Sequence, residues 1–164
     1  MRLSEAAALF ALMALAAAAV SADRKDRRPG FANDLGPETI DVSPYPVDMQ
    51  KKYALFQAKC GVCHTPARAV NSEFISEKDW SRYIKRMAMR PPCCNFCPVI
   101  SHEDSKAIWQ FLAYDSAVRK TGPRAASWAA YRAVLLQEYK SKYPKQYAER
   151  YEKKNENNDE SEKE

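Results

Sequence analysis

Long apolar runs are scarce in these 164 residues: only one occurs, and it stands near the N-terminus. Arg2 is followed by an uncharged stretch rich in Ala and Leu, from Ala6 to Ala22, which ends in small residues before the polar Asp23. This pattern predicts a signal peptide over residues 1–22, with cleavage after Ala22. An uncleaved N-terminal anchor is the alternative, although the run is near the short limit for spanning a bilayer.

Several other features are missing from the sequence. It has no internal repeat, no nucleic-acid-binding motif and no grouping of acid, base and nucleophile suited to substrate chemistry. We therefore expect neither an enzyme nor a nucleic-acid partner. Because the N-terminus predicts export, we expect a periplasmic or otherwise exported protein, which associates with a membrane only if the signal stays uncleaved.

Basic residues outnumber acidic ones and give a formal net charge of +5. Residues 51–114 hold 10 basic and 5 acidic side chains, and residues 115–151 hold 8 basic and 3 acidic ones. Residues 152–164 reverse the sign, with 3 basic and 6 acidic side chains. A basic surface steers a protein toward partners with acidic docking surfaces, although the same charges also keep a small exported protein soluble.

The most informative stretch is the pentapeptide Cys60-Gly61-Val62-Cys63-His64, which reads C-x-x-C-H. This is the pattern by which a chain holds a c-type haem. The two thiols add to the two vinyl groups on one edge of the macrocycle, and the following His becomes an axial ligand of the iron. Because the pattern needs both cysteines and the adjoining histidine, it predicts one covalent haem c more specifically than a bare C-x-x-C would.

A haem-free interpretation of the same pentapeptide stays open. Cys60 and Cys63 also suit a disulfide, a redox dithiol or half of a zinc site. A zinc site needs a second pair of ligands, and Cys94, Cys97 and His102 follow downstream. Five cysteines in an exported protein leave one unpaired, whereas assigning two of them to haem leaves three.

Breaking residues shape the first half of the chain. Residues 23–50 contain six Pro and Gly residues and no apolar periodicity, so they predict an irregular leader. From Lys51 a short helix is expected to run into the haem motif, with Phe56 one turn before Cys60 and on the same face. Residues 65–75 then predict a loop.

Two capped helices follow. Ser76, with an acid three residues on, resembles a capping box, and the apolar stripe behind it predicts an amphipathic helix that ends at the Pro91-Pro92 pair. The stripe consists of Trp80, Tyr83, Ile84 and Met87. Ser101 repeats the capping pattern and predicts a second helix, which ends near Val118.

The C-terminal part predicts a helical extension and a tail. Gly122-Pro123 breaks the chain, and Ser127 to Tyr143 predicts one more helix, which Pro144 kinks or ends. Tyrosines recur every four residues and favour a packing seam against the preceding domain over a partner-docking face: Tyr139, Tyr143, Tyr147 and Tyr151. The charged end of the chain lacks apolar residues and should be disordered. The predicted segments are therefore residues 1–22, 23–50, 51–118, 119–151 and 152–164.

Together these motifs resemble a small single-haem class I type cytochrome c over about residues 51–116. The matching residues are Phe56, Cys60, Cys63, His64, Trp80, Arg86, Met87, Phe111, Leu112 and Ala113. The resemblance implies an all-α fold: a small cytochrome c-like helical domain around a covalent haem, here with a C-terminal helical extension. It also implies single-electron transfer between redox partner proteins, with His and Met as the usual axial ligands.

The second axial ligand of the iron has three candidates. Met87 occupies the position that the resemblance implies, seven residues after Trp80 on the same helical face. Met89 lies two residues further on, close to a proline, and is the alternative. His102 would give a bis-His iron of lower potential, whereas a Met thioether raises the potential. An open or bis-His sixth position would instead indicate a haem sensor or small-ligand-binding protein.

Three further cysteines depart from the family pattern. The stretch Cys94-Asn95-Phe96-Cys97 lacks a following His, so it should not attach a second haem. We expect a disulfide between two of Cys93, Cys94 and Cys97, with a zinc site that includes His102 as the alternative. The odd thiol would be able to bridge two chains.

Overall fold

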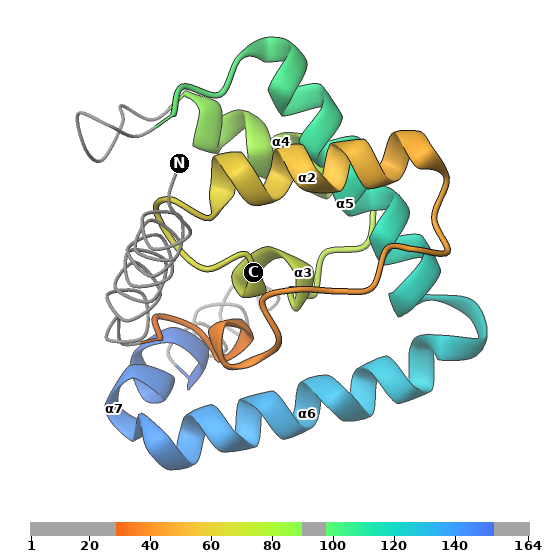
Figure 1. Cartoon of the computed structure of the whole chain (residues 1–164). Coiled ribbons are helices and arrows are strands. Elements are labelled where there is room, and N and C mark those ends of the chain that lie inside the picture. The colour runs from red at the N-terminus through yellow and green to blue at the C-terminus, as the bar shows by residue number, and fades with distance from the viewer. Residues whose placement is uncertain (1–28, 90–97, 153–164) are drawn as a thin grey trace, which may run out of the picture.

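The computed structural model describes residues 29–89 and 98–152, and these ranges form helices joined by turns and loops (Figure 1). No strand occurs within them, which confirms the predicted all-α fold. The elements in chain order are η1 (Ala32–Leu35), α2 (Val47–Cys60), α3 (Ala67–Val70), α4 (Glu77–Ala88), α5 (His102–Lys120), η2 (Gly122–Arg124), α6 (Ala125–Lys142), α7 (Pro144–Tyr147) and η3 (Ala148–Glu152).

Several predictions fall outside the described residues. These are the signal peptide and its cleavage after Ala22, the Pro91-Pro92 end of a helix, the state of the cysteines at positions 93, 94 and 97, and nearly all of the charged tail. Within the described ranges, no helix combines the length and the apolar character needed to cross a bilayer.

Helix α5 is the centre of the fold, because α2 and α4 both pack against it (Figure 1). The ring of Phe56 in α2 lies 5.7 Å from that of Phe111 in α5, measured between centroids. Trp80 in α4 donates from its indole Nε1 to Ser116 Oγ in α5 over 3.0 Å. All four side chains are fully buried, and full burial of one large apolar side chain stabilises a fold by about 2–3 kcal/mol.

The predicted caps fix where α4 and α5 begin. Ser76 Oγ accepts from the backbone N–H of Asp79 over 3.1 Å, and Ser101 Oγ accepts from that of Asp104 over 3.0 Å. The carboxylate of Asp104 also accepts from the N–H of Ser101 over 3.2 Å, which completes a capping box. Each cap contributes about 1 kcal/mol, and both helices start where the sequence predicts.

The predicted start of α2 was too late. The helix begins at Val47 rather than at Lys51, so its first turn belongs to the segment predicted to be irregular. Pro46 immediately precedes this turn in an extended conformation, and Asp48 within the turn places a negative charge near the helix N-terminus, where it is favourable. The last Pro of the leader, Pro46, therefore stands immediately before the helix and does not prevent it from starting at Val47.

Two further boundaries differ from the prediction. The short helix α3 interrupts the expected loop over residues 65–75, because the buried Pro66 supplies a fixed backbone angle at the start of a turn. Helix α5 continues past Val118 to Lys120, so the predicted division between residues 118 and 119 falls inside this helix. Its last two residues both have hydrogen-bond partners in the interior, and these partners hold the final turn in place.

The leader is fastened to the helices, although most of it is irregular as predicted. Figure 1 shows it in orange, passing between α2 and α6. The buried Asn71 donates from Nδ2 to the carbonyls of Asn33, Pro37 and Ala67 over 3.3, 3.0 and 2.9 Å. Its Oδ1 accepts from the hydroxyl of Tyr131 over 3.1 Å. One amide thus joins the leader, α3 and α6.

The tyrosine seam of the C-terminal extension packs against the leader. Helix α6 ends at Lys142, and Pro144 opens α7. Tyr139 is fully buried, and its hydroxyl donates to the carbonyl of Pro29 over 3.2 Å. The hydroxyl of Tyr151 accepts from the N–H of Ala32 over 3.1 Å. The seam therefore holds the leader.

Candidate functional site

The pentapeptide C-x-x-C-H stands where α2 ends. Cys60 is the last residue of the helix, and the N–H of Gly61 donates to the carbonyl of Gln57 over 3.1 Å. A Cβ added at Gly61 would lie 2.7 Å from that carbonyl oxygen, so only Gly fits this close approach. The chain then turns, with Cys63 exposed and His64 partly buried.

Cys60 points toward the interior. It is partly buried and packs against the apolar core that α2, α4 and α5 share. Burial raises the pKa of its thiol to about 12, and the neighbouring Cys63 adds to this rise. The two cysteines stand three positions apart, one at the end of α2 and one in the turn that follows, which is the spacing that attachment to two groups on one haem edge requires.

His64 is held in the form that binds a metal. Its Nδ1 lies 3.0 Å from the carbonyl oxygen of Thr65. A carbonyl only accepts, so this hydrogen bond places the proton on Nδ1 and leaves the lone pair of Nε2 available. Burial lowers the pKa of His64, which favours the same neutral imidazole. Metal-bound histidines are usually oriented in this way, by a hydrogen bond from the other ring nitrogen.

One polar atom beside the motif lacks a partner. The hydroxyl oxygen of Thr65 is buried and makes no hydrogen bond within the described part of the chain, as is also true of Ser72 Oγ. A buried hydroxyl of this kind calls for an explanation, and a group bound next to His64 supplies one. This hydroxyl, the two thiols and the oriented imidazole are the groups of this site that a covalent haem would contact.

Aromatic and charged side chains surround the motif. Tyr83 of α4 packs against the rings of Phe74 and Trp80, with centroids 5.5 and 6.0 Å away. Tyr83 and Cys60 pack against the same apolar core. Burial raises the pKa of Tyr83, and the positive charge of Arg68 opposes the rise. The site therefore has one wall from α4 and a cationic group from α3.

The packing of the helices decides which ends of them lie together. Trp80 at the start of α4 contacts Ser116 near the end of α5, so these two helices run antiparallel and the end of α4 lies toward the start of α5. Lys59, next to the motif, pairs with Asp104 in the first turn of α5 over 2.9 Å. The end of α4, the start of α5 and the motif therefore share one end of the fold.

All three candidates for the second axial ligand come from that end. Met87 is partly buried on the face of α4 that carries the buried Trp80 and Ile84. Met89 is 75% exposed, and His102 is exposed at the first position of α5. The partly buried thioether is best placed to face a bound group, so Met87 remains the predicted ligand.

The zinc alternative concerns residues that the structure describes only in part. Within residues 29–89 and 98–152, no three His, Cys, Asp or Glu side chains are placed to hold a metal ion by themselves. His102 is exposed, and the three cysteines predicted to join it lie outside these ranges. The zinc site and the disulfide remain untested predictions.

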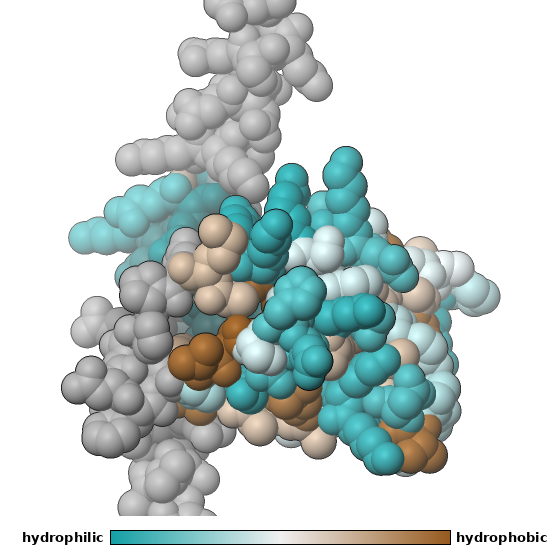
Figure 2. All heavy atoms as spheres, turned by 90° about the horizontal axis from the view of Figure 1, so that it is seen from above, coloured by the Kyte–Doolittle hydropathy of each residue, from teal (hydrophilic) through white to brown (hydrophobic). Residues whose placement is uncertain are grey.

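Basic side chains lie on the outer face of α4. The helix exposes five residues, of which four are cations: Lys78, Arg82, Lys85 and Arg86. The fifth is Glu77, and the partly buried Asp79 pairs with Arg82 over 3.3 Å. Figure 2 shows that hydrophilic side chains cover most of the described part of the face seen from above, with small separate apolar patches between them.

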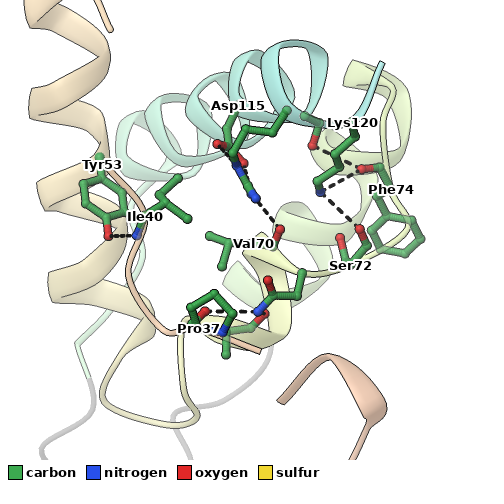
Figure 3. Close-up of polar contacts among 12 residues, drawn as sticks. Pro37, Ile40, Tyr53, Val70, Ser72, Phe74, Asp115 and Lys120 are labelled. Atoms are coloured by element: carbon green, nitrogen blue, oxygen red, sulfur yellow. Dashed lines mark hydrogen bonds and ion pairs between the residues drawn. The ribbon is translucent and has the colours of Figure 1, made fainter. Parts of the chain in front are cut away.

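Two buried charges next to the core were not predicted. Lys120 donates from Nζ to the carbonyls of Ser72 and Phe74 over 3.1 and 3.3 Å (Figure 3). Asp115 has no exposed surface. The sequence does indicate the burial of Asp115. This residue follows Phe111 and Leu112 by one helical turn, so a carboxylate interrupts the apolar face of α5.

Comparison of this chain with protein-family models, with characterised proteins and with solved structures finds no match. The likeness to class I cytochromes c is therefore one of local motifs. The function has to be inferred from the residues of the site themselves.

Proposed function

We propose that this chain is an exported monohaem c-type cytochrome that carries single electrons between redox partner proteins. The observation that carries the proposal is the state of His64 at the end of α2. This imidazole directly follows two cysteines, is partly buried, and binds a carbonyl through Nδ1, so that Nε2 keeps its lone pair. A chance C-x-x-C-H sequence would not need an oriented histidine.

In this proposal each residue of the site has a distinct role. Cys60 and Cys63 would hold the haem through thioether bonds, and His64 would bind the iron through Nε2. Met87 would provide a soft second ligand. The bound haem supplies an iron that changes between ferric and ferrous forms. The fully buried Phe56 and its apolar neighbours would limit the access of water to the haem.

The basic face of α4 favours partners of opposite charge. Its cations lie on the outer face of the helix whose inner face carries Met87, so an acidic partner attracted to them would dock on α4, with that helix between it and the haem. Exposed charges act mainly on the rate of association and are screened by salt. We therefore expect electron transfer to such a partner to slow as ionic strength rises.

Covalent attachment is the first property to test. The chain is produced together with a haem-attachment system, separated under denaturing conditions and stained for haem. Wild-type protein should keep its haem, and Cys60→Ala with Cys63→Ala should lose it. His102→Ala is the matched control, because removal of an imidazole outside the motif should leave the stain unchanged. Haem that dissociates from wild-type protein under denaturing conditions would contradict the proposal.

A second candidate function has one observation in its favour. His102 begins α5, whose first turn is tied to Lys59 beside the motif through Asp104. An imidazole at this end would permit a bis-His iron, or an open position suited to a small ligand, as in a haem sensor. A weak red absorbance band from Met ligation of ferric iron would support the electron carrier, whereas rapid binding of carbon monoxide would support the sensor.

A further inference from the structure

An ion pair joins the leader to α3 close to the haem motif. Arg68 donates from Nε to Asp34 Oδ1 over 2.9 Å and from Nη2 to Oδ2 over 2.7 Å. The Asp34 side chain is 6% exposed and that of Arg68 27%. Asp34 also accepts from the N–H groups of Gly30 and Phe31 over 2.8 and 3.0 Å. Both charges are therefore held in one geometry, and water screens them only in part.

The C-terminal extension fixes this pair from the other side. Two guanidinium groups lie over the ring of Phe31, that of Arg68 4.8 Å and that of Arg150 4.2 Å from its centroid. The hydroxyl of Tyr151 accepts from the N–H of Ala32, the residue after Phe31. Residues 150 and 151 thus hold the part of the leader that carries Asp34.

A shared acceptor connects Arg68 to His64. The carbonyl of Thr65 accepts from His64 Nδ1 over 3.0 Å and from the backbone N–H of Arg68 over 3.3 Å. The imidazole and the arginine are therefore fixed to the same peptide group. The pair therefore places one positive and one negative charge, fixed relative to each other, beside the residue that would hold the iron.

We propose that Arg68 and Asp34 are positioning residues that set the reduction potential of the iron held by His64, with Arg68 raising it and Asp34 lowering it. This inference rests on the proposed function. Reduction removes one positive charge from the iron. A fixed cation nearby therefore favours the ferrous form, and a fixed carboxylate favours the ferric form.

The two members of the pair predict shifts of opposite sign. Arg68→Gln should lower the midpoint potential and Asp34→Asn should raise it, each by at least threefold in the ratio of ferrous to ferric protein at a fixed applied potential. At 59 mV for a tenfold change in a one-electron couple, threefold corresponds to about 28 mV. Arg68→Lys, which keeps the charge, should stay within twofold of wild type.

A purely structural role predicts a different result. Loss of the ion pair loosens the same contact whichever member is removed, so both single variants should lower the midpoint of chemical denaturation. An effect that acts through loosening would also shift the potential in the same direction for both variants. Opposite shifts of the potential together with parallel losses of stability would support the inference, and shifts of equal sign would overturn it.

The matched control is the ion pair of Lys52 and Asp48 on α2, 3.4 Å long. Asp48 stands 12 residues before Cys60, which is about 18 Å along a helix. Lys52→Gln and Asp48→Asn should change the ratio of ferrous to ferric protein by less than twofold. If they shift it as strongly as the Arg68 and Asp34 variants do, the effect comes from net charge and the inference fails.

The outcomes separate this inference from the proposed function. Colourless wild-type protein would overturn both. Wild-type protein with covalent haem, whose potential changes by less than threefold in Arg68→Gln, would overturn only the inference. If Asp34→Asn does not accumulate as folded protein, Arg68→Gln and Arg68→Lys decide the matter: a lower potential in the first and its restoration in the second support the assignment.

Discussion

The hydroxyl of Tyr45 donates to the carboxylate of Asp115 over 2.9 Å and so joins the leader to α5 in the core. Arg119 donates to the same carboxylate from Nε and Nη2 over 2.6 and 2.5 Å, and to the carbonyl of Val70 over 2.8 Å (Figure 3). One fully buried carboxylate thus connects the leader, α3 and α5. These hydrogen bonds to Asp115 explain why the leader lies in a fixed position.

Asp115→Ala should therefore destabilise the protein strongly. It leaves the buried part of Arg119 without its counter-charge, and the loss of one member of a buried pair costs about 3–5 kcal/mol. Tyr45→Phe removes only one hydrogen bond to a charged group and should cost about 1.5–3 kcal/mol. Chemical denaturation of both variants measures these losses of the free energy of unfolding.

The control for this prediction is Asp48→Ala, which removes a carboxylate from an exposed pair on α2. It should change the free energy of unfolding by about 1 kcal/mol or less. An Asp115→Ala variant no less stable than this control would show that the buried network does not hold the leader in solution.

Lys120 predicts an unusual dependence of stability on pH. Its ammonium lies 5.3 Å from the ring centroid of Trp80 and 5.1 Å from that of Trp128. Burial lowers the pKa of Lys120 from 10.5 to about 7, opposed by the charge of Asp115 and assisted by those of Arg119 and Arg132. The two indole faces and two carbonyl oxygens favour the charged form and work against this shift.

The sign of the effect follows from proton binding. Between pH 7 and 10.5 the unfolded chain binds more protons at Lys120 than the folded chain does, so the free energy of unfolding rises with pH. The slope is at most about 1.4 kcal/mol per pH unit. Lys120→Met should remove this contribution, and Lys106→Met, a change at an exposed position of the same helix, should not. Equal slopes from pH 7 to 9 in wild type and Lys120→Met would contradict the prediction.

Gly36 is required by the space around it. A Cβ at this position would collide with the side-chain amide of Asn71 and would lie 2.5 Å from the hydroxyl of Tyr131. Gly36→Ala should cost about 1–3 kcal/mol through overpacking where the leader, α3 and α6 meet. Thermal denaturation should show a lower Tm for this variant.

Gly122 is required by its backbone conformation and not by the space around it. A Cβ there meets nothing within 4 Å, but the backbone has a φ of 57°, which disfavours other residues. Gly122→Ala should therefore cost about 1–2 kcal/mol from the backbone alone. The double change Gly36→Ala with Asn71→Ala should recover part of the overpacking loss, whereas Asn71→Ala should not change the cost at Gly122. If Asn71→Ala recovers nothing at Gly36 and changes the cost at Gly122, the steric explanation of Gly36 is wrong.

The identity of the second axial ligand can be tested by substitution. Met87→Ala should lower the reduction potential, because loss of the thioether removes a ligand that stabilises ferrous iron. Met89→Ala should leave the potential unchanged, since this side chain is 75% exposed. Electrochemical titration measures both. The reverse result would move the ligand to Met89.

The sequence predicted the parts of the fold that depend on local patterns. The caps at Ser76 and Ser101 and the apolar stripes behind them are properties of one helix each, so the starts of α4 and α5 were predicted correctly. The position of the leader depends on contacts between distant segments, such as Tyr45 with Asp115. No local pattern contains such a pair, so the partner of Tyr45 could not be read from the segment.

The distinction between local patterns and contacts of distant residues applies to the candidate site as well. The motif Cys60 to His64 could be read directly from the chain, because its chemistry depends on adjacent residues. The pairing of Arg68 with Asp34 could not, since 34 positions separate the two residues and each is an ordinary surface type of side chain. The tyrosine seam shows both aspects: its spacing predicted packing, but the leader that it packs against is distant in sequence.

The most direct test of the central claim is the absorption spectrum of the reduced, purified protein in alkaline pyridine. The protein is produced with a competent haem-attachment system, and wild type is compared with Cys60→Ala carrying Cys63→Ala. A haem bound through two thioether bonds should give the pyridine haemochrome spectrum of haem c, in a ratio of one haem per chain, and the double variant should give none. Colourless wild-type protein, or zinc without iron in its metal analysis, would contradict the account.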